Sequence, residues 1–135
     1  YGDIYNTPEY LKTDAGVQKD QYSVAAFVGY NHSRFSLGAE YNRAFNYKFL
    51  SGTDVNGYSV YTIVNVAPKM HLFGRFDLLD ATGENTNNVS EGHTIIGGFE
   101  YSPIRQVRIS PNYQGWKARN GRRENYLLLS VECKI

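Results

Sequence analysis

The sequence predicts an all-β fold: an antiparallel transmembrane up-and-down β-barrel, or a segment of about seven to eight strands of one. Three observations predict it. Apolar and polar residues alternate in seven runs between Gln21 and Ile135, short and long connections alternate between those runs, and aromatic side chains gather near the run ends. A strand that crosses a bilayer at a tilt needs about 9–11 residues. Lipid also demands complete backbone pairing and apolar side chains on the outer face.

Composition narrows the class of protein. The chain has 135 residues, a formal net charge of +1 and 15% aromatic residues, so its charge gives no nucleic-acid footprint. The single Cys excludes an intrachain disulfide framework and a Cys-based zinc site. The mean hydropathy of −0.48 is typical of a soluble protein. A barrel, however, carries its membrane face on every second residue, which lowers that mean.

Each run sets an apolar series of residues against a more polar one. The runs are 21–30, 34–45, 58–66, 70–79, 93–101, 106–116 and a last run that ends at Ile135. In the first, Tyr22, Val24 and Val28 oppose Ser23 and Gly29, and no helical period of 3.6 competes over a comparable length. Residues 1–20 are polar and irregular, with room for one strand ending near Tyr10. Residues 21–135 are therefore expected to form the strands of a single barrel domain.

The connections indicate an orientation. Short turns fall at 31–33, 67–69 and 102–105, and longer loops at 11–20, 46–57, 80–92 and 117–123. Outer-membrane barrels have short periplasmic turns and longer extracellular loops, so we expect Ile135 on the periplasmic side. Two aromatic bands fit the two interfaces of a bilayer: Tyr30, Phe35 and Tyr101 lie beside short turns, and Tyr22, Tyr41, Phe45, Tyr47, Tyr58 and Tyr113 lie toward the long loops.

The polar series carries charges of both signs, which we expect to face the lumen. They are Arg34, Glu40, Arg75, Asp77, Glu100, Arg108, Glu132 and Lys134. A lipid-facing Arg or Lys near the bilayer midplane costs roughly 2–4 kcal/mol, so an inward position is strongly favoured. Four of these residues lie on three consecutive strands, and cross-strand pairing predicts an ion-pair ladder among them. Collectively the charges indicate a polar lumen, whereas each residue taken individually is better explained by filling and bracing a polar interior.

Catalytic and metal-binding patterns are weak, so we expect no enzyme activity, catalytic residue, metal or cofactor. His32, His71 and His93 form no metal-ligand spacing. Loop 80–92 holds oxygen donors that suit Ca²⁺, but it lacks the spaced acids of an EF-hand. Cys133 falls in the lipid-facing series and is interpreted as a small wall residue.

The basic segment 117–123 contains Lys117, Arg119, Arg122 and Arg123. These cations suit anionic lipopolysaccharide or anionic solutes. A loop that only aids solubility explains them equally well.

Three stretches carry a resemblance: FSLGAEYN (35–42), LFGRFDLLDATG (72–83) and VRISPNYQGW (107–116). With the closing ENYLLLSVECKI, they resemble the C-terminal part of porin-like outer-membrane β-barrel proteins of the Bacteroidetes type, over about residues 21–135. The resemblance implies a wide antiparallel barrel with a polar interior and a location in the cell outer membrane. It also implies a longer whole protein, of which this chain is the last third or half. The chain departs from the pattern at its end, because many outer-membrane proteins end in an aromatic residue and this one ends in Ile135.

The expected function is passive diffusion of small polar solutes through a polar lumen, with outer-membrane lipid around the wall. Seven strands leave unpaired edges, so we expect missing chain or other copies to complete the barrel. Two alternatives remain. One is a closed eight-stranded barrel with a structural or adhesion role, whose interior would be filled by Phe27, Tyr61, Phe73, Trp116 and Tyr126. The other is a soluble lipocalin-like barrel that binds an apolar ligand.

Overall fold

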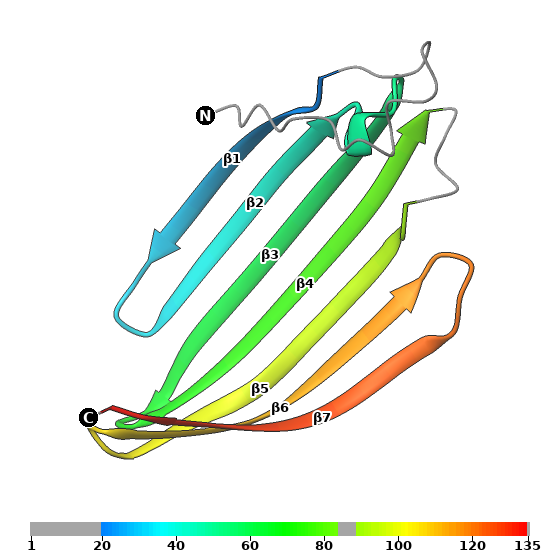
Figure 1. Cartoon of the computed structure of the whole chain (residues 1–135). Coiled ribbons are helices and arrows are strands. Elements are labelled where there is room, and N and C mark those ends of the chain that lie inside the picture. The colour runs from blue at the N-terminus through cyan, green and yellow to red at the C-terminus, as the bar shows by residue number, and fades with distance from the viewer. Residues whose placement is uncertain (1–19, 84–88, 135) are drawn as a thin grey trace.

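The computed structural model describes residues 20–83 and 89–134 and contains one twisted, curved sheet (Figure 1). Its seven strands lie in chain order, and each pairs antiparallel with the next. Their bounds are β1 (Tyr22–Asn31), β2 (Phe35–Phe45), β3 (Thr53–Ala67), β4 (Met70–Gly83), β5 (Gly92–Ile104), β6 (Val107–Ala118) and β7 (Arg123–Cys133). A short 3-10 helix, η2 (Tyr47–Phe49), joins β2 to β3.

The predicted all-β, up-and-down, antiparallel arrangement is confirmed, but the sheet is not closed into a barrel. Among the described residues β1 pairs only with β2, and β7 pairs only with β6. The strand expected near Tyr10 lies outside these residues. In the part of the chain that the structure describes, no helix has the length and apolar character to span a membrane.

The connections separate into two sets at opposite ends of the sheet (Figure 1). The β1–β2, β3–β4 and β5–β6 turns lie at one end, which is also where β7 finishes. Pro68 and Lys69 alone join β3 to β4, and Arg105 and Gln106 alone join β5 to β6. The longer connections, including η2, lie at the other end. The expected alternation of short and long connections is therefore present.

The strands reach further into the long-connection end than predicted. Residues 53–57 and 80–83 belong to β3 and β4, so the prediction of loops across 46–57 and 80–92 was wrong for these residues. Their polar character suggested loops. They are strand because backbone partners are available on the neighbouring strand, with Val55 opposite Ala81.

The registers give the sheet two different faces. On what we call the apolar face lie Tyr22, Val24, Val28, Tyr30, Phe35, Leu37, Tyr58, Val60, Val64, Leu72, Phe76, Leu78, Ile95, Phe99, Tyr101, Ile109, Tyr113, Leu127, Leu129 and Val131. On what we call the charged face lie Glu40, Ser59, Tyr61, Ile63, Phe73, Arg75, Asp77, Glu100, Arg108, Leu128 and Glu132. Side chains alternate between faces along each strand, so each register fixes both sets at once.

Almost nothing in the described sheet is buried. Apart from the glycines Gly38, Gly57, Gly92 and Gly115, the buried residues among those described are Val55, at 6% exposure, Ala81, at 8%, and Thr53, at 0%. All three lie at the long-connection end, and large apolar side chains elsewhere stay exposed, with Leu127 reaching 86%. The described residues therefore form a single layer held by backbone ladders, without a hydrophobic core of the usual kind.

The β5–β6 ladder is interrupted near Pro111. These strands pair at Gly98↔Asn112 and again at Tyr101↔Ile109, with no paired residues between them. Pro111 lies in this gap and has no N–H to give to a ladder, while its other neighbour, β7, pairs with it normally at Leu129. A Cβ on Gly98 would meet the Pro111 carbonyl oxygen at 2.6 Å and the Asn112 Cβ at 2.7 Å. The bare glycine backbone thus allows β6 to approach here.

Two adjacent glycines allow this tight approach to be tested. We expect Gly98→Ala to destabilise the folded protein by about 1–3 kcal/mol, the usual cost of overpacking, because backbone must move to accept the methyl group. Gly97→Ala is the matched control, since its Cβ would meet only the Phe73 carbonyl oxygen at 3.8 Å. Denaturant unfolding of both variants measures the difference. Equal denaturation midpoints for the two variants would show that β5 and β6 can move apart at Gly98 at little cost.

Candidate functional site

The residues predicted to face a lumen fall largely on the charged face. The registers place six of them there: Glu40, Arg75, Asp77, Glu100, Arg108 and Glu132. Arg34 instead lies in the turn before β2, and Lys134 follows the end of β7. The structure gathers most of the set into two clusters, and Glu40 lies apart from both, where its carboxylate accepts a hydrogen bond from Asn42 at 3.3 Å.

The first cluster is the ion-pair ladder that the sequence predicts. Arg108 Nε lies 3.7 Å from Glu100 Oε1, and Arg108 Nη1 lies 3.6 Å from Glu132 Oε2. Lys134 Nζ continues the series at 3.7 Å from Glu132 Oε1. The guanidinium thus bridges β5 and β7 from its position on β6. These separations are long for charge-assisted hydrogen bonds, so the ladder is a set of loose, partly hydrated ion pairs.

The second cluster centres on Asp77 of β4. Arg75, two residues earlier on the same face, donates from Nε to both carboxylate oxygens at 2.8 and 2.9 Å. Ser59 lies directly opposite on β3 and donates its hydroxyl to the same carboxylate. Asp77 is therefore held by two strands. The terminal nitrogens of the Arg75 guanidinium remain available for further partners in the space beside the sheet.

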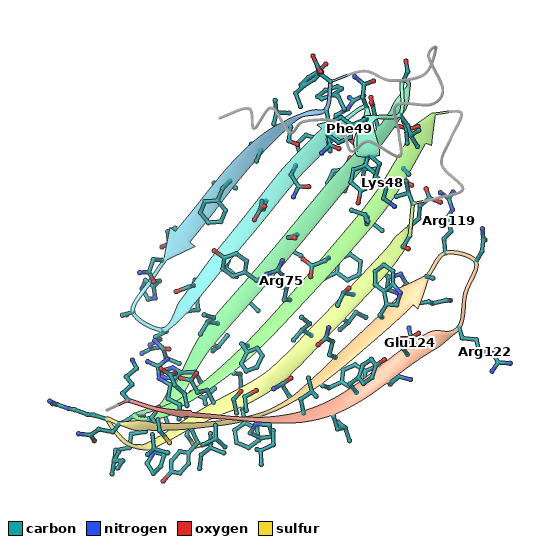
Figure 2. The ribbon with its side chains drawn as sticks, viewed as in Figure 1. Lys48, Phe49, Arg75, Arg119, Arg122 and Glu124 are labelled. Carbon is teal, nitrogen blue, oxygen red and sulfur yellow. The ribbon has the colours of Figure 1, made fainter. Side chains whose placement is uncertain are left out.

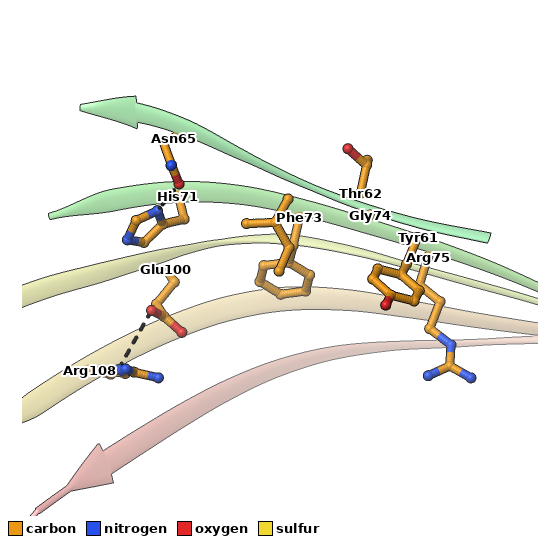
Figure 3. A pocket seen from close by; sticks show the side chains of 10 residues that line it. Tyr61, Thr62, Asn65, His71, Phe73, Gly74, Arg75, Glu100 and Arg108 are labelled. Atoms are coloured by element: carbon orange, nitrogen blue, oxygen red, sulfur yellow. Dashed lines mark hydrogen bonds and ion pairs between the residues drawn. The ribbon is translucent and has the colours of Figure 1, made fainter. Parts of the chain in front are cut away.

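A cavity of about 460 Å³ lies between the two clusters. Figure 3 shows Arg75 at one end of it, Glu100 and Arg108 at the other, and Phe73 between them. Tyr61 and Phe73 project to the same side of β3 and β4 and give this space an aromatic wall. The site combines an apolar wall with ion pairs at both ends. That arrangement offers a small molecule apolar contact along the wall and charged partners at either end.

Sequence reasoning missed two residues that line this cavity. Asn65 and His71 lie opposite each other across the β3–β4 turn, and His71 Nδ1 lies 2.7 Å from Asn65 Oδ1. No signal in the sequence pointed to this contact. Counting outward from a two-residue turn at Pro68 and Lys69 pairs residue 66 with residue 71, and an irregularity between Asn65 and Ala67 shifts the register so that Asn65 lies opposite His71 instead. The registers place His71 on the charged face, between Asn65 and Glu100.

Two acidic residues of segment 80–92, which was expected to offer Ca²⁺ ligands, instead form ion pairs with an arginine. Arg119 Nη1 lies 3.2 Å from Asp80 and 3.1 Å from Glu91, and Glu91 also accepts the Ala81 N–H at 2.9 Å. Residues 84–88, which include Glu84, lie outside the described part. Among residues 20–83 and 89–134, no three His, Cys, Asp or Glu side chains are placed to hold a metal ion.

The apolar face has polar and aromatic residues toward its long-connection end. Tyr22 stacks on Phe45 with ring centroids 4.4 Å apart, and the Arg43 guanidinium carbon lies 4.4 Å from the Phe45 centroid. Arg43 Nη2 also lies 2.7 Å from Asp54 Oδ2. Cys133, on the last strand, is exposed, and its register places it on the apolar face as expected. The predicted aromatic positions of Tyr22 and Phe45 toward the long connections are confirmed.

The Arg108 ladder is expected to add little to stability. Its side chains are 28% to 56% exposed, and exposed ion pairs contribute roughly 0.2–1 kcal/mol. Arg108→Gln should lower the free energy of unfolding by less than about 1 kcal/mol, and the difference should vanish in concentrated salt because of screening. Arg105→Gln, in the exposed β5–β6 turn, is the control. A larger loss that salt does not reduce would contradict a loose ladder.

No protein-family model, curated protein or solved structure matches the chain.

Proposed function

We propose that this chain forms wall strands of a porin-like β-barrel in the cell outer membrane, through which small polar solutes diffuse passively. One observation carries the proposal. The two faces of a single-layer sheet differ in chemistry, with most of the large aliphatic side chains on one face and both clusters of charges on the other. A bilayer wall requires that division, because it meets lipid on one side and an aqueous lumen on the other.

The exposed apolar area supports lipid as the neighbour of the apolar face. Val60, Leu72, Phe76 and Leu129 are 40% to 68% exposed, and complete burial of such a side chain is worth about 1.5–3 kcal/mol. Exposed apolar patches of this extent mark contact with a protein or a membrane. Two shallow hollows on this face, of about 340 and 420 Å³, share Leu37 and Val60 in their linings. Acyl chains fit surfaces of this kind.

The charged face supports a water-filled lumen. Its ion-paired side chains keep part of their hydration, with exposed fractions from 26% at Asp77 to 56% at Lys134. Ionised groups are costly in lipid but not beside water. Charges of both signs beside the cavity would act on passing solutes through their charge. The role proposed for the charged face is therefore the reversible binding of solutes, without covalent chemistry.

The proposal includes further strands beyond β1 and β7. Each of these edge strands has unpaired backbone groups in the described sheet, and no lipid-exposed sheet edge is stable within the hydrocarbon. Additional chain or other copies of this chain would supply the missing partners.

A filled barrel with a structural role is the second candidate. Phe27 stacks with Tyr61 on the charged face at a centroid distance of 6.3 Å, and Phe73, Trp116 and Tyr126 share that face. Aromatic rings of this size fill the interior of a small barrel. The number of strands in the complete barrel decides between the candidates, because only a wide barrel leaves an aqueous channel beside these rings.

Two adjacent leucines on β7 test the assignment of faces. Leu129 lies on the apolar face and Leu128 on the charged face, and both are exposed, at 68% and 45%. Leu129→Arg should weaken folding into lipid vesicles by about 2–4 kcal/mol, since it places a charge in the hydrocarbon. Leu128→Arg should be tolerated. Urea titration of vesicle-bound protein measures both effects. Equal effects of the two substitutions would contradict the assignment of lipid to the apolar face.

Conductance distinguishes an open wall from a filled one. Incorporation of the full chain into a planar bilayer should give ion-conducting events, and Arg75→Gln should shift the permeability ratio toward cations because a lumen cation is lost. Arg105→Gln, in the β5–β6 turn away from the cavity, should leave that ratio unchanged. If protein that inserts into vesicles gives no conductance in the planar bilayer, the filled barrel is favoured over the diffusion pore.

A further inference from the structure

Two cations oppose each other on the apolar face at the long-connection end. Lys117 of β6 is the direct cross-strand partner of Arg123 of β7, and both side chains are exposed. Neither makes an ion pair or hydrogen bond with any residue of the described part of the chain. Like charges placed directly opposite each other destabilise a sheet, so this pair calls for an anion that the described residues do not supply.

The nearby acids are already engaged. Asp80 and Glu91 both bind Arg119, at 3.2 and 3.1 Å. Glu124, adjacent to Arg123 in sequence, belongs to the charged face and accepts a hydrogen bond from the Tyr126 hydroxyl at 2.9 Å. The remaining cross-strand neighbour of Lys117 is His93, which stacks on Phe76 at 5.9 Å. Among residues 20–83 and 89–134, the pair thus has no carboxylate of its own.

The pair lies where the apolar part of this face ends. Moving along β6 and β7 toward the short turns, the next residues on this face are Gly115 opposite Asn125, and then Tyr113 opposite Leu127. The Tyr113 hydroxyl donates to Asn125 Oδ1 at 2.7 Å, which leaves the Asn125 amide group free to donate outward. Figure 2 shows Arg122 in the β6–β7 connection just beyond, projecting away from the sheet.

We propose that Lys117, Arg123 and the Asn125 amide bind the phosphate of an anionic lipid headgroup, with the acyl chains along the adjoining apolar face. The inference rests on the proposed membrane function, because that function puts lipid against this face. A guanidinium fork matches phosphate oxygens in a bidentate manner, and an ammonium adds a second charge. Tyr113 marks the level where headgroups meet hydrocarbon, as aromatic rings at membrane interfaces do.

The position on the apolar face favours a lipid over a solute. A solute in the lumen would meet Arg75 and Arg108 on the opposite face. A lipid phosphate is instead held at this level by its own acyl chains, so its local concentration beside Lys117 and Arg123 is high. Free phosphate has the same charge but lacks that anchoring.

The test uses the full chain in vesicles of phosphatidylcholine, with and without a minor fraction of phosphatidic acid. Phosphatidic acid retained on the detergent-extracted protein is counted by native mass spectrometry. Lys117→Gln/Arg123→Gln should bind it about tenfold more weakly than the unsubstituted chain. Arg34→Gln/Arg105→Gln removes the same charge at the opposite end and should retain full binding. Equal loss in both double variants would reduce the effect to net charge and overturn the site.

Two further arms separate the possible failures. If inorganic phosphate added to phosphatidylcholine vesicles raises the unfolding midpoint as much as phosphatidic acid does, the site binds free anions and the lipid assignment is overturned. If the chain inserts into phosphatidylcholine vesicles but shows no preference for phosphatidic acid, only this inference fails. If it does not insert at all, the proposed membrane function fails with it.

Discussion

Pairing between antiparallel neighbours is the constraint on which the rest of this structure depends. The described strands have no second layer against them, and Val55, Ala81 and Thr53 are their only buried residues other than glycine. Backbone hydrogen bonds between consecutive strands therefore set the fold, whereas in most domains the core shares this role with them. Each register positions every side chain on its two strands, and the separation of apolar from charged residues follows from pairing. A slip of one residue in any pair would exchange the faces of a whole strand.

The same constraint explains why the charge clusters exist. Arg108 meets Glu132 because the β6–β7 register places them directly opposite, and Ser59 meets Asp77 for the same reason on β3 and β4. None of these contacts requires burial, and each is exposed enough to exchange with water. A face built in this way carries charge in a fixed pattern without depending on it for stability. Its chemistry can therefore vary among related sequences at small cost to the sheet.

Strand positions and faces were readable from the sequence because the alternation has a period of two, as strands do. Strand ends were less readable. Thr53 and Asp54 look like loop residues, yet they continue β3 because β4 offers partners there. The Arg108 ladder was predicted, since its members sit on successive strands. The Arg119 contacts with Asp80 and Glu91 were not predicted. They join the β6–β7 connection to the end of β4 and to the residue before β5, which lie far away in sequence, and no local period reports such contacts. Closure also lay beyond the sequence pattern, since alternation is the same in an open and a closed sheet.

The interrupted pairing at Pro111 gives the sheet a mechanical weak point. Between Gly98 and Tyr101, β5 lacks partners on β6, so backbone amides there should open and exchange with solvent before those of the continuous ladders on either side. The Glu100–Arg108 ion pair links the two strands beside this gap. This ion pair therefore holds β5 to β6 at a place where the backbone ladder between them is interrupted. A charge pair that contributes little to global stability can still govern local breathing, and its strength changes with ionic strength while that of the backbone does not.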